Sequence, residues 1–168
     1  ALDVPGLTLS TTTKGALVVT LPGHSHSAPR ALAAHVDTLG AMVCEVKSNG
    51  RLMLTQLGGY AWQAIEGENV TILSLRDGRR WRGTVQTINP SVHTSTKARE
   101  GKREQETMEV RIDARTSKKE ETLALGIDVG DFVFLDPRVE VTDTGYIKSR
   151  HLDDKAGVAV IYGALHAL

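Results

Sequence analysis

Two segments, each built from two apolar runs around a glycine turn, constrain the fold of this chain most. Residues 41–57 carry strand-like runs on both sides of Asn49-Gly50, and residues 69–88 carry such runs on both sides of Asp77-Gly78. Asn-Gly and Asp-Gly favour the positive backbone φ angles that a tight hairpin turn requires. The segments therefore predict two β-hairpins, and hairpins spaced so closely predict a small all-β unit, a barrel.

Further strand-like stretches are expected to belong to the same β unit. Residues 108–114 alternate between apolar and polar side chains, and residues 132–135 and 139–141 are predicted to complete the unit. The run from Lys97 to Glu109 mixes charges of both signs, which favours an exposed loop over a binding site.

A short helix is predicted over residues 117–125, between two of these strands. Ser117 followed three residues later by Glu120 has the pattern of a capping box, in which two side chains satisfy backbone N–H groups at the helix start. Gly126 supplies the usual stop at the other end.

The segments on either side of the β unit have a different character. Residues 7–13 and 15–22 are rich in β-branched residues and predict two joined strands. Residues 31–35 predict a short strand that is buried on both faces. Residues 158–168 predict a helix that is apolar nearly all round, as helices inside a larger structure are.

We therefore expect an α/β part, residues 1–40 and 141–168, interrupted by a β unit over residues 41–140. Insertions commonly enter open α/β sheets at the carboxyl ends of strands, where active sites lie, so chemistry is expected at the two seams. The sequence has no initial methionine and ends within an apolar helical segment, so we also expect a piece of a longer protein.

Composition sets limits on the partners of the protein. The 168 residues are 40% hydrophobic, and 20 acidic side chains balance 20 basic ones, as in ordinary globular proteins. Zero net charge removes the general electrostatic argument for nucleic acid or an anionic membrane surface, and no apolar run reaches the roughly 18 residues of a membrane span. The single cysteine, Cys44, can form no internal disulfide, which fits a cytoplasmic protein.

A histidine and a carboxylate mark the first seam, at His35 and Asp37. Side chains on a strand alternate faces, so these two would project together while Val36 points into the core. A metal-ligating imidazole usually has its second ring nitrogen held by a carboxylate, so the spacing suits a ligand and its orienting group.

Two adjacent carboxylates, Asp153 and Asp154, mark the second seam, at the expected start of a helix. A carboxylate at the end of a strand can bridge two cations about 3.5–4 Å apart, while its neighbour caps the helix. Both aspartates could instead cap the helix, and His35 could be an ordinary core histidine. From the residues alone, these alternatives stay open.

The whole chain resembles the glutamyl aminopeptidase and deblocking aminopeptidase family, dinuclear metallopeptidases that include the tetrahedral TET particles. The most specific matches are Ala34-His35-Val36-Asp37-Thr38-Leu39-Gly40 and His151-Leu152-Asp153-Asp154-Lys155, in that order, about 115 residues apart with a β-rich insert between them. The family's usual arginine after the aspartates is Lys155 here, so a bidentate role at that position is not carried over.

The resemblance implies a ligand set and a fold. His35 would ligate one of two divalent metal ions, zinc or cobalt, and Asp153 would bridge both. Asp37, as a catalytic residue, would orient His35. Asp154 would support the site without binding metal, and the peptide bond between Asp153 and Asp154 would be cis. The implied fold is α/β: part of a metallopeptidase (phosphorylase/hydrolase-like) α/β/α domain, interrupted by a PDZ-like β-barrel domain.

The implied function is that of an aminopeptidase, which removes N-terminal residues from peptides with a metal-activated water. Residues 41–140 would be a dimerisation domain that helps to build homo-oligomers, from dimers to dodecamers. The family's general-base glutamate and remaining ligands lie downstream of residue 168, so the chain alone is expected to be inactive.

Two other functions are compatible with the same residues. The protein could be a related dinuclear hydrolase that acts on another amide, such as an N-acyl or dipeptide substrate. It could also be a non-catalytic binding or assembly module, in which residues 41–140 offer a sheet edge to a peptide or another subunit.

Overall fold

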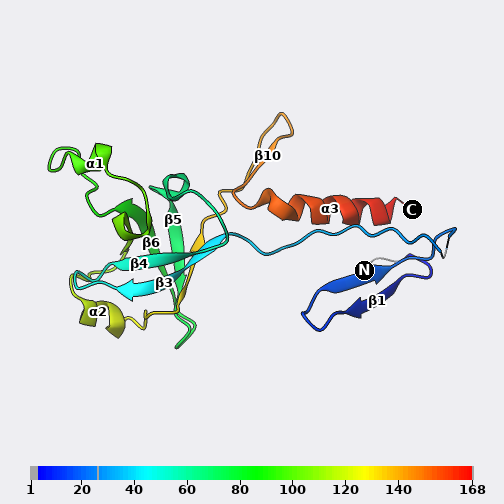
Figure 1. Ribbon diagram of the computed structural model, residues 1–168, viewed down its shortest axis with the longest axis horizontal. Helices are drawn as coiled ribbons and strands as arrows, with labels where there is room; N and C mark the ends of the chain where they lie inside the picture. Colours follow the sequence, from blue (N-terminus) through cyan, green and yellow to red (C-terminus); the bar gives the residue numbers. More distant parts are fainter. Residues whose placement is uncertain (1–3, 26, 168) are drawn as a thin grey trace. The chain divides into compact units, whose positions relative to one another are not determined.

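The structure is a computed structural model that describes residues 4–25 and 27–167. The chain divides into two compact units. The barrel unit comprises Thr38–Arg150, and the flanking unit comprises Ala1–Asp37 together with His151–Leu168. Figure 1 shows the elements of each unit.

The barrel unit is built around six antiparallel strands that close on themselves, as the turn signals predicted. The strands lie in the order β3-β4-β7-β6-β5-β8 around the barrel. Closure leaves no strand of the barrel with an unpaired edge. Their bounds are Gly40–Val46 (β3), Leu52–Leu57 (β4), Asn69–Leu73 (β5), Arg80–Thr87 (β6), Met108–Ile112 (β7) and Phe132–Leu135 (β8).

The interior of the barrel is a continuous apolar core. Inward and outward side chains alternate along the strands, so that Val70 and Ile72 on β5 are buried while Thr71 between them is not. The buried apolar cluster consists of Ala41, Val43, Val46, Leu52, Leu54, Ile65, Val70, Ile72, Val85, Met108, Val110, Ile112, Ile127, Val133 and Leu135.

Both predicted hairpins form, but the first turn differs from the expectation. Only Gly50 has a positive φ, 79°, whereas Asn49 does not, and the amide of Gly50 donates to the carbonyl of Lys47. The turn is therefore longer than a two-residue one, and glycine alone takes the left-handed conformation. At the second turn Gly78 has a φ of 73°.

The predicted helix forms as α2, Lys119–Ala124, but without the predicted capping box. The Oε2 atom of Glu121, not of Glu120, accepts hydrogen bonds from the amide and hydroxyl of Ser117, at 2.7 and 3.2 Å. The helix begins two residues after Ser117, so the carboxylate that reaches back to it lies four residues on. Gly126, with a φ of 92°, follows the end of the helix as expected.

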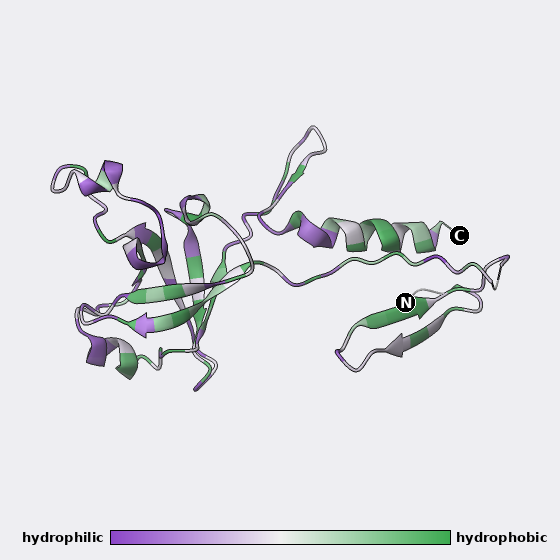
Figure 2. Ribbon diagram, viewed as in Figure 1, coloured by the Kyte–Doolittle hydropathy of each residue, from purple (hydrophilic) through white to green (hydrophobic). Residues whose placement is uncertain are grey.

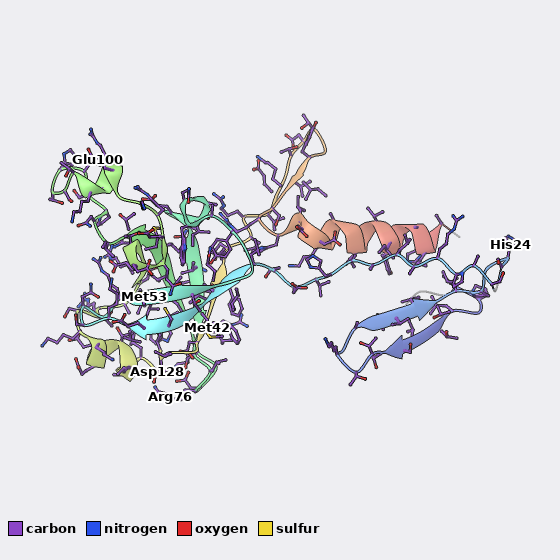
Figure 3. All side chains as sticks on the ribbon, in the orientation of Figure 1. His24, Met42, Met53, Arg76, Glu100 and Asp128 are labelled. Atoms are coloured by element: carbon purple, nitrogen blue, oxygen red, sulfur yellow. The ribbon has the colours of Figure 1, made fainter. Side chains whose placement is uncertain are left out.

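The charged run that begins at residue 97 contains regular secondary structure rather than being a loop throughout. It contains the short helix α1, Lys97–Glu100, and the 3-10 turn η2, Gln105–Thr107, before β7 begins. Figure 3 shows Glu100 on α1, at the outside of the barrel unit. Another 3-10 turn, η1, spans Trp62–Ile65.

Glu109, the last residue of that charged run, is an exception because it is fully buried in β7. The Nζ atom of Lys47 lies 2.8 Å from its carboxylate, and Arg51 donates to the other oxygen. These two cations compensate the burial of the charge. The expectation that this residue lies in an exposed loop is wrong.

Residues 139–141 do not complete the barrel, contrary to the prediction. β9, Glu140–Val141, pairs with β10, Ile147–Lys148, as a separate hairpin. β8 already pairs with both β3 and β5 and closes the barrel, so no position in it is left for a further strand.

The flanking unit consists of a hairpin, an extended segment and a helix. The hairpin pairs β1, Thr8–Thr11, with β2, Leu17–Thr20, and the helix α3 spans Leu152–His166. The strand predicted over residues 31–35 does not form, because no neighbouring strand in the described residues pairs with it. Figure 2 shows apolar residues along β2 and α3, and Leu168 lies outside the described residues.

In the parts of the chain that the structure describes, no helix is long and apolar enough to span a membrane.

Candidate metal centre

His35 and Asp37 face each other on the extended segment of the flanking unit. The Nδ1 atom of His35 lies 3.1 Å from Oδ1 of Asp37 and 3.3 Å from its backbone oxygen. A proton on Nδ1 would be held by these oxygens, which leaves Nε2 as the ligating nitrogen. Val36 between them is 64% exposed rather than in a core, because no second layer covers this segment in the described residues.

Asp153 meets the other nitrogen of the same imidazole. The Nε2 atom of His35 lies 3.1 Å from Oδ1 of Asp153. His35 is half exposed, and the side chain of Asp153 is 92% exposed. Two motifs that are far apart in the sequence are therefore brought together around one imidazole.

The two adjacent aspartates do different things. The peptide bond between Asp153 and Asp154 is cis, as the resemblance implied. Both residues have non-helical backbone angles, so the regular part of α3 starts after Asp154. The Oδ1 atom of Asp154 accepts a hydrogen bond of 3.2 Å from the amide of Gly157, which is the position of a helix N-cap. Helix capping therefore accounts for Asp154 but not for Asp153.

The electrostatics at His35 favour its protonated form in the absence of a metal. Desolvation lowers the pKa of His35, but the charge of Asp37, a hydrogen bond to its backbone and the charge of Asp153 together raise that pKa above its usual value. A metal ion binds neutral imidazole, so metal binding at His35 would compete with protonation of the ring.

The donor atoms fit zinc or cobalt in kind, although they do not complete a site. Imidazole nitrogen and carboxylate oxygen are ligands that both metals accept. Catalytic zinc sites usually have three protein ligands. In the described residues no group of three or more histidine, cysteine, aspartate or glutamate side chains could hold a metal ion. The described residues therefore offer a partial ligand set.

Sequence reasoning named the neighbours of the site but missed one residue. His151 is buried just before α3, and Lys155 is exposed on its first turn. The missed residue is Gly157, whose amide binds Asp154. The only signal in the sequence is a glycine three residues after an aspartate at a helix start.

Residues near both ends of the barrel unit form polar contacts with one segment, residues 60–68. The hydroxyl of Tyr60 donates to the carbonyl of Gly40 at 3.0 Å, and burial raises the pKa of Tyr60 to about 12, so that the hydroxyl keeps its proton. At the other end, Arg150 lies 2.8 Å from Glu68 and donates to the carbonyl of Ala64. The residues adjoining both seams are thus held by contacts within the barrel unit.

Comparison with known proteins identifies the family. The profile of the M42 glutamyl aminopeptidases matches residues 15–168, which is most of the chain. The chain belongs to the M42 glutamyl aminopeptidase family. The resemblance found in the two motifs is confirmed.

Among curated proteins, the chain is 48% identical over 155 residues to "Putative aminopeptidase YhfE" of Bacillus subtilis (strain 168). The alignment covers 92% of this chain and 44% of that relative. The chain thus spans less than half the length of the curated relatives it matches.

Solved structures share the fold. The aminopeptidase APDkam598 from the archaeon Desulfurococcus kamchatkensis has a TM-score of 0.78 and 28% identity, over 96% of this chain and 42% of that one. The TET1 peptidase of Pyrococcus horikoshii has a TM-score of 0.69 at 20% identity, over 98% and 47% of the two chains. The α/β fold of such aminopeptidases, with a six-stranded barrel, is therefore present in this chain.

Proposed function

We propose that the complete protein is a two-metal aminopeptidase that removes N-terminal residues from peptides. The observation that carries the proposal is the pair of contacts at His35, with Asp153 3.1 Å from Nε2 and Asp37 3.1 Å from Nδ1. A carboxylate behind the imidazole and another beside its free nitrogen are what a histidine ligand next to a bridging aspartate requires. Membership of the M42 family supports the same reading.

Each residue has a distinct role in this proposal. His35 would ligate one ion, Asp153 would bridge two ions, and Asp37, the proposed catalytic residue, would orient His35. Asp154 supports the site by capping α3. When bound, two ions, zinc or cobalt, would polarise the scissile carbonyl and activate a water, as in other two-metal hydrolases.

The remaining parts of the site are proposed to lie outside these 168 residues. In the described residues no group of three or more histidine, cysteine, aspartate or glutamate side chains could hold a metal ion, and the curated relatives are more than twice as long as the matched region. This chain alone is then expected to bind metal weakly and to hydrolyse nothing.

Residues 41–140 are proposed to be an inserted, PDZ-like dimerisation domain, and residues 1–40 and 141–168 the N-terminal part of a catalytic α/β/α domain. The closed barrel with its own core supports the first assignment. The Pyrococcus horikoshii TET1 peptidase, which has the same fold, can assemble into a tetrahedron or a large octahedral shell. A cytoplasmic homo-oligomer, from dimer to dodecamer, is the corresponding proposal for this protein.

The test is turnover of unblocked peptides by the complete protein, before and after chelation. We expect chelation to abolish turnover and zinc or cobalt to restore it. His35→Ala and Asp153→Ala should each lower kcat/KM by at least about a hundredfold, because a metal ion contributes several kcal/mol at the transition state. Gly163→Ala, on α3 away from the site, is the matched control.

Two other outcomes would favour the other functions. Turnover of N-acylated peptides but not of unblocked ones would point to a related amide hydrolase. Retained oligomers with no turnover and no stoichiometric metal would leave a binding or assembly module, which the self-contained barrel could serve alone. Either result would overturn the aminopeptidase proposal.

A further inference from the structure

Gly157 leaves open the space that the carboxylate of Asp154 occupies. A Cβ atom at position 157 would lie 2.7 Å from Oδ2 and 2.8 Å from Cγ of Asp154, and closer still to Oδ1. A Cβ atom almost never lies within 3.0 Å of an atom to which it is not bonded, so with a side chain at position 157 the carboxylate would have to move. The same carboxylate accepts the hydrogen bond from the amide of Gly157, at 3.2 Å.

This arrangement is not that of an ordinary helix cap. Capping boxes regularly place a large side chain three residues after the N-cap, so the cap itself does not demand glycine there. Glycine also weakens a helix relative to alanine, because it has more backbone freedom to lose. Its presence in the first turn of α3 is explained by the carboxylate of Asp154, which lies against its α-carbon.

A second glycine in the same helix, Gly163, has open space where Gly157 has a close neighbour. A Cβ atom at Gly163 would meet no described atom within 4 Å. Both glycines lie in α3, and helix propensity affects both alike. Only Gly157 has a neighbour that excludes a side chain.

We propose that Gly157 is a positioning residue of the metal centre. It admits the carboxylate of Asp154 to the start of α3, and this fixes the backbone that carries Asp153. Asp153 directly precedes Asp154, so a shift of the second residue moves the first. The contact at stake is the 3.1 Å approach of Asp153 to His35. The proposal rests on the proposed function, in which these two residues are metal ligands.

The test is a titration of the metal-free complete protein with cobalt, followed by visible absorption, which reports the ligand geometry around the ion. Gly157→Ala should lower cobalt affinity by about tenfold or more, as loss of a group that orients a ligand does. It should also change the absorption spectrum. Gly163→Ala should keep the affinity and the spectrum of the unchanged protein.

A second pair of variants separates this role from helix propensity and from misfolding. Asp154→Ala removes the atoms that a side chain at position 157 would strike, so adding Gly157→Ala to Asp154→Ala should cause no further loss of cobalt affinity. The double variant should also be at least as helical as Asp154→Ala alone, because alanine favours helix over glycine.

Three results would overturn the proposal. The first is unchanged cobalt affinity and spectrum in Gly157→Ala, and the second is additive losses of affinity from Asp154→Ala and Gly157→Ala. Either of these refutes the role of Gly157 while the proposed function stands. If the unchanged complete protein binds no cobalt, the proposed function fails, and the role of Gly157 fails with it.

Discussion

The barrel unit and the flanking unit differ in how much of their apolar surface they bury. Every member of the apolar core cluster belongs to the barrel unit. In the described residues of the flanking unit, His151 alone is buried. Yet the candidate ligands His35 and Asp153 belong to the flanking unit. The part of the chain with the most complete core is thus not the part that carries the proposed chemistry.

The flanking unit exposes large apolar side chains, which proteins normally bury. Leu32 is 78% exposed, Val160 is 71% exposed, and the hairpin shows Leu9 and Leu17. Contiguous exposed apolar patches are typical of surfaces that contact other protein. The proposal that further residues of the complete protein cover these faces would explain why only the barrel unit has its own core.

The largest expected difference between the units is in the cost of removing an apolar side chain. In this 168-residue chain, Ile72→Ala should lower the free energy of unfolding by about 2–5 kcal/mol, because Ile72 is fully buried in the barrel. Val160→Ala, at an exposed position of α3, should change it by no more than about 0.5 kcal/mol. Urea unfolding followed by tryptophan fluorescence measures both, and equal costs would contradict the contrast.

A smaller effect is expected at the buried charge of the barrel unit. Glu109→Gln should destabilise the chain by about 1–3 kcal/mol, because Lys47 and Arg51 would lose their charged partner. Glu100→Gln, an exposed carboxylate on α1, is the control and should be nearly neutral. The same urea titration applies, and a neutral Glu109→Gln would show that the buried pair contributes nothing to the barrel.

The smallest effect is a pH dependence at the turn of the second hairpin. Hydrogen bonds from the backbone amide and the side-chain Nε of Arg79, together with the charge of Arg79, lower the pKa of Asp77 from 3.8 to about 2. A carboxyl whose pKa is lower in the folded state stabilises the fold above its unfolded pKa, and this contribution is lost as the pH falls through the folded value.

The chain should therefore lose stability between about pH 4 and pH 2 that Asp77→Asn does not lose. Unfolding free energies of both proteins across this range give the difference directly, since other carboxyls titrate alike in the two. Parallel pH profiles would show that Asp77 is not held by the turn.

Local signals in the sequence predicted the barrel but not which strands belong to it. Gly50 and Gly78 marked both hairpins, because glycine alone takes the left-handed backbone cheaply. Residues 132–135 and 139–141 were both predicted to complete the barrel, and only the first of them does, because membership depends on long-range pairing that alternation along one strand does not encode. The strand predicted over residues 31–35 does not form for a related reason, because a strand needs a neighbouring strand to pair with and the described residues provide none.

The sequence predicted the candidate metal ligands but not the residues that position them. His35 and Asp153 stand in motifs that a family resemblance can find, and the structure brings them together. The space at Gly157 follows from the rotamer of Asp154, which the sequence does not contain. The burial of Glu109 was likewise not predicted, because the sequence of a charged run does not distinguish a buried charge from a surface charge.

The central claim is that His35 and Asp153 are metal ligands of an aminopeptidase, and metal content tests it most directly. The ions bound per chain should be counted in the complete protein and in the His35→Ala and Asp153→Ala variants. We predict two divalent ions per unchanged chain, at most one tightly bound ion after His35→Ala, and loss of both after Asp153→Ala. Two ions retained with unchanged affinity in both variants would contradict the account.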